Sequence, residues 1–175
     1  FRSVGAALLG LHTGVISKLP AHDIGSFMKG KIRSFGVSDD FFMYDQSSAA
    51  RVGIYYYENG AYPRKPKVIY DRNHSSFFSL DIDEIPEEVY TASKCFHTTG
   101  ITLALNGDIR ETTIEMIKRF KAAGTLVSFD VNFRGNLWTG DQARECILRI
   151  LPYVDIFFCS EDTARLTFLK TGTAR

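Results

Sequence analysis

The stretch that decides the fold is TLVSFDVNFR, residues 125–134, which begins with a short apolar run and ends in polar side chains. Its first part, Thr125–Val131, has the length and composition of a buried strand. Similar runs stand on either side of it, at Lys94–Thr98 and Asp155–Cys159, with helical patterns between them. Strand starts roughly 30 residues apart are typical of successive βαβ units. The sequence therefore predicts an α/β fold, with a mostly parallel sheet flanked by helices.

The helices between these strands are expected to have recognisable ends. Asp108, followed three residues later by Glu111, predicts a capping box at the start of a helix that ends at Gly124. Ser160 is expected to cap a last helix that runs through Lys170.

Two further elements are expected near the N-terminus. The run Gly14-Val15-Ile16, within Leu11–Lys18, suits a buried strand. Asp23 can cap the next helix, and Gly36 is placed for its left-handed C-terminal cap. The apolar residues of this helix form a stripe on one face: Ile24, Phe27, Met28, Ile32 and Phe35.

The middle of the chain has a different character. Arg51–Tyr57 and Lys67–Arg72 are strand-like runs rich in aromatic and β-branched residues, joined by a turn-rich link that contains Asn59-Gly60. We interpret them as a pair of strands outside the main sheet.

Composition excludes several classes of protein. The 175 residues carry 21 basic and 20 acidic side chains, for a net charge of +1, which gives no reason to expect nucleic acid or a membrane surface as a partner. No apolar run approaches the roughly 20 residues that span a bilayer. The usual glycine-rich cradles for dinucleotides and phosphates, G-x-G-x-x-G and G-x-x-x-x-G-K-S/T, are absent from the sequence. We expect a cytoplasmic protein that meets any charged ligand with a local cluster.

Asp130, Asn132 and Arg134 form the first candidate cluster. They lie two residues apart where a strand ends, so strand periodicity places them on one side. The carboxyl end of a parallel strand is where such sheets bind ligands. An arginine there can meet a carboxylate or phosphate with two hydrogen bonds. The alternative is that Asp130 and Asn132 only brace the loop while Arg134 is solvated.

The second candidate cluster is Tyr70 and Arg72, which share one face of the second middle strand. At least one of the tyrosines at 55–57 is expected on the same side. A phenol and a guanidinium together suit a hydroxylated, anionic ligand. The alternative is an exposed sheet edge protected by charge and aromatic side chains.

The run Asp130-Val131-Asn132-Phe133-Arg134, followed by Leu137-Trp138, resembles the DxNxR…LW signature of PfkB/ribokinase-family sugar kinases, most closely the branch that phosphorylates 2-keto-3-deoxygluconate. Further stretches agree in order along essentially the whole chain: Thr13–Leu19 with Asp23 and Gly25, Gly53-Ile54-Tyr55, Ile69–Arg72 and His97–Thr102.

The resemblance implies a ribokinase-like fold, with an α/β core formed by residues 1–48 and 73–175 and a small β lid at 49–72. It implies ATP and Mg²⁺ as cofactors and transfer of the γ-phosphoryl group to a primary hydroxyl of a keto-sugar acid, chemistry that rests mainly on positioning. The positions similar to substrate-binding residues are Gly5, Tyr55, Tyr70, Arg72, Asn132 and Arg134. Those expected on the phosphate and nucleotide side are Asp130, Arg134, Ser160 and Thr163. No residue of this chain is expected to be a metal ligand.

The sequence departs from the family pattern in several places. The C-terminal G-x-G-D, which carries the catalytic Asp, is expected beyond Arg175, so the chain resembles a fragment that lacks catalytic residues. The family's first glycine motif is compressed, which predicts that residues were left out between Gly5 and Ala6. Ser160 and Thr163 stand where many relatives have Asn and Glu, which puts the nucleotide side in doubt more than the sugar side.

Alternative functions stay open at this point. The substrate could instead be fructose, a nucleoside or another neutral sugar, or the protein could be a catalytically silent sugar sensor on the same fold. Arg72 together with Arg134 favours an acid, because a neutral sugar needs no such pair. The lid strands leave a sheet edge open, which would allow the lids of two copies to pair in a homodimer.

Overall fold

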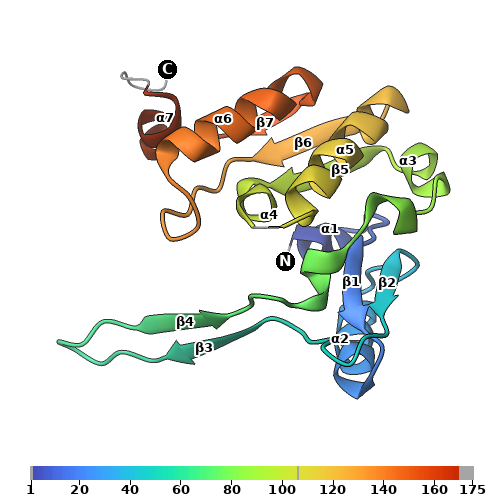
Figure 1. Cartoon of the computed structure of the whole chain (residues 1–175), viewed down its shortest axis with the longest axis horizontal. Helices are drawn as coiled ribbons and strands as arrows, with labels where there is room; N and C mark the ends of the chain where they lie inside the picture. The colour runs from blue at the N-terminus through green and yellow to red at the C-terminus, as the bar shows by residue number, and fades with distance from the viewer. Residues whose placement is uncertain (1, 106, 170–175) are drawn as a thin grey trace. The chain divides into compact units, whose positions relative to one another are not determined.

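A computed structural model describes residues 2–105 and 107–169 of the chain (Figure 1). The chain divides into two compact units, Phe1–Leu80 and Asp81–Arg175. Among the described residues, no helix has the length and apolar character needed to cross a membrane.

The first unit begins with helix α1 (Arg2–Leu8), strand β1 (Ser17–Pro20), helix α2 (Asp23–Arg33) and strand β2 (Phe42–Asp45). Strands β1 and β2 pair in parallel, from Ser17 opposite Phe42 to Pro20 opposite Asp45. The predicted strand at 14–16 is wrong by a few residues, since Gly14 makes only an isolated bridge to Ser38. Helix α2 confirms the predicted helix, and Gly36 has the positive φ of 75° expected after it. The predicted cap at Asp23 is wrong, because the side chain of His22 accepts from the amide of Ile24 and Asp23 is the first residue of the helix.

Helix α1 includes the position where the sequence predicts that residues were left out. The helix runs without a break across Gly5 and Ala6, and the amide of Leu9 donates to the carbonyl of Gly5 at 3.2 Å. The prediction that residues were left out between Gly5 and Ala6 stays a prediction.

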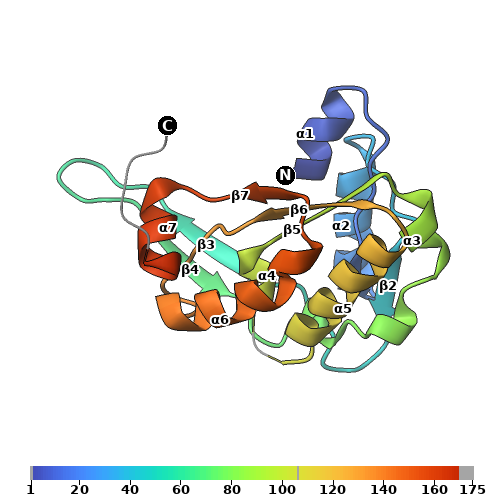
Figure 2. The same ribbon diagram turned by 90° about the horizontal axis from the view of Figure 1, so that it is seen from above.

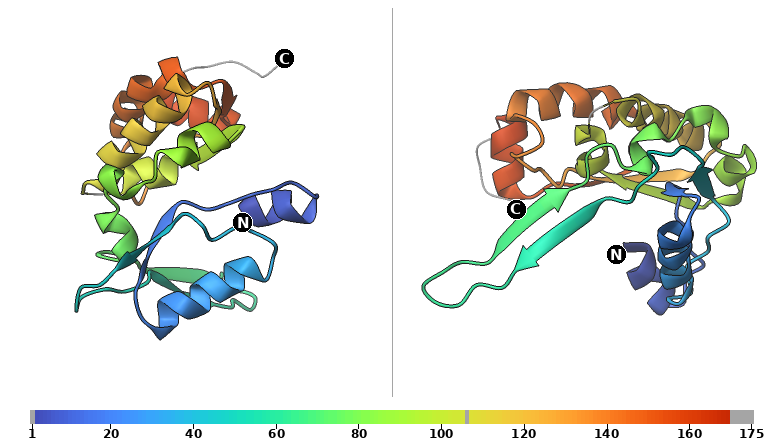
Figure 3. Two further views of the ribbon diagram at one scale, coloured as in Figure 1. Left: turned by 90° about the vertical axis from the view of Figure 1, so that its right-hand side faces the viewer. Right: turned by 60° about the horizontal axis from the view of Figure 1, so that its bottom comes forward.

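The predicted middle strands are confirmed as an antiparallel hairpin, β3 (Ile54–Glu58) and β4 (Lys67–Asp71), which the right-hand view of Figure 3 shows clearly. Every residue of the two strands is exposed, so the hairpin has no buried face of its own. A 3-10 turn, η1 (Ser76–Ser79), follows the hairpin and contacts β1 and β2.

The second unit contains the predicted βαβ succession. Strands β5 (Cys95–Thr99), β6 (Leu126–Asp130) and β7 (Ile156–Phe158) form a parallel sheet in that order. The helices are α3 (Glu88–Ala92), α4 (Gly100–Ala104), α5 (Ile109–Ala122), α6 (Gly140–Ile150) and α7 (Glu161–Phe168), with 3-10 turns η2 (Ile82–Glu84) and η3 (Leu151–Tyr153).

The core of this unit lies between the sheet and the helices α4, α5 and α6, which cover one face of it (Figure 2). Val127 and Phe129 point to this face and are 0% exposed. Phe120 of α5 stacks on Phe96 of β5, with ring centroids 4.2 Å apart. The alternate residues of β6 point to the opposite face, where Leu126 is half exposed. The strand therefore has one apolar, covered face and one mixed face.

Of the two helix caps predicted for this unit, only one is confirmed. Asp108 precedes α5, but its side chain makes no capping hydrogen bond, so the predicted capping box is wrong. Glu111 instead accepts two hydrogen bonds from Arg149 of α6, at 2.8 and 2.6 Å, which lowers the pKa of its carboxyl. Ser160 does cap α7, accepting from the amide of Thr163 at 3.2 Å, while Lys170 lies outside the described residues.

Candidate functional site

The hairpin brings together three of the predicted ligand residues. Tyr55 and Tyr70 are direct cross-strand partners, with ring centroids 6.4 Å apart. The guanidinium carbon of Arg72 lies 4.7 Å from the centroid of the Tyr70 ring. Both phenols are exposed and Arg72 is half-buried. This confirms the prediction that the two tyrosines and Arg72 share a face, and we call these three residues the hairpin cluster.

The hairpin cluster has the chemistry of a receptor for a hydroxylated anion. The two phenols can donate to and accept from hydroxyl groups, and the guanidinium can offer parallel N–H donors to a carboxylate. The guanidinium lies over the Tyr70 ring, and this cation–π contact holds the Arg72 side chain on the same face as the two phenols.

The second unit presents polar side chains at the carboxyl ends of its strands. Asp130 ends β6, opposite Thr99 of β5 and Phe158 of β7. One carboxylate oxygen of Asp130, Oδ1, accepts from the amide of Asn132 at 3.0 Å. This hydrogen bond holds the loop that follows β6. It agrees with the alternative interpretation from the sequence, in which Asp130 braces this loop.

Arg134 and Asn132 lie on this loop and not on an extension of the strand. Strand β6 ends at Asp130, and Asn132 has a positive φ of 39°. Strand periodicity therefore fails as the reason for placing Asp130, Asn132 and Arg134 on one side. Arg134 is exposed, and its Nη1 donates to the neighbouring carbonyl of Phe133 at 3.0 Å.

Ser160 and Thr163 lie just beyond β7, where Ser160 Oγ donates to Thr163 Oγ1 at 2.9 Å. Cys159, between the strand and this pair, is half-buried. Burial raises the pKa of the Cys159 thiol, and the negative charge of Asp130 raises it further. The charge of the Asp130 carboxylate therefore affects Cys159, in the segment between β7 and α7.

Gly5, the remaining predicted residue, lies in the middle of helix α1 and is exposed. A Cβ built on it would have no neighbour within 4 Å, so this position shows no close approach that requires glycine. Its predicted role in substrate binding stays a prediction.

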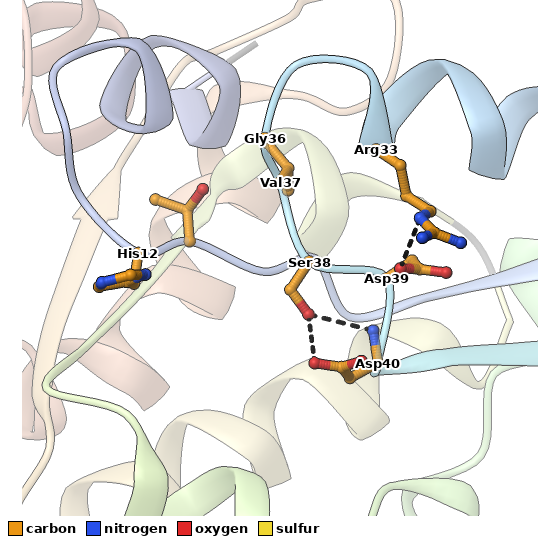
Figure 4. A pocket seen from close by; sticks show the side chains of 8 residues that line it. His12, Arg33, Gly36, Val37, Ser38, Asp39 and Asp40 are labelled. Carbon is orange, nitrogen blue, oxygen red and sulfur yellow. Dashed lines mark hydrogen bonds and ion pairs between the residues drawn. The ribbon is translucent and has the colours of Figure 1, made fainter.

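A cavity of about 300 Å³ opens elsewhere in the first unit, between His12, Thr13, Arg33 and the loop 36–40 (Figure 4). Several polar side chains that line the cavity form ion pairs or hydrogen bonds with one another. Arg33 Nε lies 3.4 Å from Asp39 Oδ1, and Ser38 Oγ lies 2.6 Å from Asp40 Oδ2. None of the predicted ligand residues lines this cavity.

Within residues 2–105 and 107–169, no group of three or more His, Cys, Asp or Glu side chains could hold a metal ion. Asp130 nevertheless supplies a carboxylate at the strand ends. Mg²⁺ at phosphoryl-transfer sites is typically bound through one or two carboxylates, with phosphate and water supplying the remaining ligands.

Sequence reasoning missed residues that hold these clusters in place. Gly100, at the start of α4, is so close to the loop after β6 that an added Cβ would lie 2.1 Å from the carbonyl oxygen of Val131. Arg51, before β3, pairs with Asp71 at 2.7 Å. The available signals were the glycine directly after a strand and the opposite charges at the two ends of the hairpin sequence.

Comparison with known proteins places these features among sugar kinases. The chain is 34% identical over 172 residues to a 2-dehydro-3-deoxygalactonokinase of Haloferax volcanii, covering 98% of this chain and 53% of that protein. It is 28% identical to the probable fructokinase-6, chloroplastic, of Arabidopsis thaliana, covering 97% of this chain and 43% of the relative. The crystal structure of a 2-dehydro-3-deoxygluconokinase from Thermotoga maritima superposes with a TM-score of 0.87 at 30% identity, covering 97% of this chain and 52% of the other.

The parallel α/β unit and the hairpin agree with the ribokinase-like fold, the class that the matched sugar-kinase structure represents. The model of the pfkB family carbohydrate kinases matches residues 2–174, and the chain belongs to that family. It spans about half the length of the curated relatives it matches.

Proposed function

We propose that the full-length protein phosphorylates a keto-sugar acid such as 2-keto-3-deoxygluconate, transferring the γ-phosphoryl group of ATP to its primary hydroxyl. The observation that carries the proposal is the hairpin cluster, in which the guanidinium of Arg72 is oriented on Tyr70 beside the phenol of Tyr55. A carboxylated, hydroxylated sugar matches all three groups. The 34% identical relative, a 2-dehydro-3-deoxygalactonokinase, supports the same class of substrate.

The strand-end residues are assigned to the phosphoryl side of the reaction. Asn132 would bind the sugar and Arg134 would meet the carboxylate or the transferred phosphate, while Ser160 and Thr163 would face the nucleotide. Asp130 would lie on the phosphate and nucleotide side, where Mg²⁺ would neutralise phosphate charge. The protein residues contribute mainly orientation, because phosphoryl transfer needs little other chemistry from the protein.

Phosphorylation of fructose is the second candidate. It is favoured by the 28% identity to a probable fructokinase over 97% of this chain. A neutral ketose gives Arg72 no anionic partner, which is why we rank it below the acid. A catalytically silent sugar sensor on the same fold is the third reading and predicts sugar binding without turnover.

The hairpin also suggests how two copies could associate. Ile54, Tyr56 and Ile69 lie on the face opposite the hairpin cluster and are 44%, 58% and 52% exposed. We propose that the lids of two copies cover this face in a homodimer. The division into a core at 1–48 and 73–175 and a lid at 49–72, and the cytoplasmic location, likewise stay proposals.

The proposal is tested by assaying the full-length protein with ATP and Mg²⁺ against 2-keto-3-deoxygluconate, 2-keto-3-deoxygalactonate, fructose and a nucleoside. Turnover of a keto-sugar acid, with a product phosphorylated at the primary hydroxyl, is the expected result. Preferred turnover of fructose would overturn the substrate assignment. Sugar binding without any turnover would favour the sensor.

A further inference from the structure

Arg51 lies shortly before β3 in the sequence, and its side chain contacts both neighbours of Arg72, Asp71 and Asn73. Its Nη2 donates to Asp71 Oδ2 at 2.7 Å, and its Nη1 donates to the carbonyl oxygen of Asn73 at 3.0 Å. One planar guanidinium therefore holds the chain on each side of Arg72. A lysine ammonium at this position could not offer the same fixed pair of donors.

The backbone of Arg51 is itself anchored. Its amide donates to Ser76 Oγ at 3.1 Å, and its carbonyl accepts from the amide of Ser76 at 2.8 Å. Ser76 is buried and begins the turn η1, whose last carbonyl, that of Ser79, accepts from Lys18 Nζ of β1 at 3.0 Å. The base of the hairpin is thus tied to the β1–β2 sheet through Arg51 and η1.

The hairpin has two faces at this point, and Arg51 acts on the one away from the hairpin cluster. Asp71 points toward Arg51, while Arg72, the next residue, points toward Tyr70. Gly53 lets the first strand approach closely here, since a Cβ on it would lie 3.0 Å from Cβ of Arg72. The backbone of Arg72 is therefore held from one face while its side chain is presented on the other.

We propose that Arg51 is a positioning residue for recognition of the substrate's carboxylate, acting through Arg72 and touching no substrate itself. The inference rests on the proposed function, because it takes the hairpin cluster as the carboxylate receptor. It assigns the specificity for an acid to a pair of arginines on the same hairpin, of which only one meets the ligand. Without Arg51, the main chain at Asp71 and Asn73 loses its shared anchor, and Arg72 samples other orientations.

The test is a double-mutant cycle in the full-length protein, with KM and kcat measured for 2-keto-3-deoxygluconate. Arg51→Met should raise KM about fivefold, with kcat changed less than about twofold, because contacting or linked residues typically show coupling of this size. In an Arg72→Ala background the same substitution should add nothing, since the residue it positions is gone. Arg51→Lys should recover only part of the loss.

Arg64→Met is the matched control. It also removes an arginine–carboxylate pair from this hairpin, that of Arg64 with Glu58 at 3.0 Å, and should leave KM unchanged. An equal increase in KM from Arg51→Met in both backgrounds would overturn the inference, because a general loss of structure does not depend on Arg72. If Arg51→Met does not fold, Asp71→Asn takes its place in the cycle.

The outcome for the unmodified protein separates the two proposals. If it phosphorylates a different sugar, the substrate assignment fails, and the same cycle measured with that sugar decides the role of Arg51. If it phosphorylates nothing, a crystal structure of the Arg51→Met protein decides: displacement of Arg72 from Tyr70 supports the inference, and an unmoved Arg72 refutes it.

Discussion

Replacing Arg72 by alanine probes the charge that the hairpin offers to a ligand. In the structure its guanidinium carbon lies over the Tyr70 ring, 4.7 Å from the ring centroid, and the residue is half-buried. If this contact is kept when the ligand binds, its loss does not change the free-energy difference between the free and the bound protein. The substitution removes from the bound state the charged hydrogen bond between Arg72 and the ligand, which is typically worth about 1.5–3 kcal/mol.

Partial exposure of Arg72 places the effect near the lower end of this range, since solvent weakens charged contacts. A loss of about 1.5 kcal/mol corresponds to a rise in KM for a keto-sugar acid of roughly tenfold or slightly more, with kcat nearly unchanged. The assay is steady-state phosphorylation by the full-length protein, with Arg64→Ala as the control on the same hairpin. An unchanged KM, or an equal rise for the acid and for fructose, would remove Arg72 from carboxylate recognition.

Gly100→Ala should lower the free energy of unfolding by about 1–3 kcal/mol in denaturant titrations, because its Cβ would lie 2.1 Å from the carbonyl oxygen of Val131; an unchanged midpoint would refute the close approach. Asp155→Asn should reduce stability most near neutral pH. A lysine ion pair and a backbone amide lower the pKa of the Asp155 carboxyl in the folded state, so its contribution is present above the unfolded pKa of about 4 and is lost as pH falls through the lower folded value. A stability difference that grows toward acid would contradict this sign. Phe120→Ala should cost about 3–5 kcal/mol by calorimetry, because the ring is 1% exposed, whereas the exposed Lys118→Ala on the same helix should cost little; similar losses would count against the described core.

Local patterns were enough to predict most of the architecture. The spacing of the three parallel strands, the middle hairpin and the cap at Ser160 each depend on residues close together in sequence, and all are confirmed. The shared face of Tyr70 and Arg72 followed from the alternation of side chains along a strand, and the stacked guanidinium confirms it.

Features set by distant residues could not be predicted in the same way. Glu111 has the spacing of a capping residue, but Arg149, 38 residues away, takes its carboxylate instead. The side chains after Asp130 no longer alternate between two faces, because β6 ends there and Asn132 has a left-handed backbone conformation. The alternation of polar and apolar residues in the sequence does not show this change of conformation. The apolar stripe predicted on α2 does lie on a helix, yet Phe27 in this stripe is 70% exposed. A sequence pattern identifies an apolar face of a helix but does not show whether another element covers that face.

The central claim is that Arg72 of the hairpin cluster binds the carboxylate of a sugar acid. A crystal structure of the full-length protein with 2-keto-3-deoxygluconate tests it directly. We predict guanidinium nitrogens of Arg72 within hydrogen-bonding distance of the carboxylate, about 2.7–2.9 Å. A sugar acid held by other residues, with Arg72 turned to solvent, would contradict the claim.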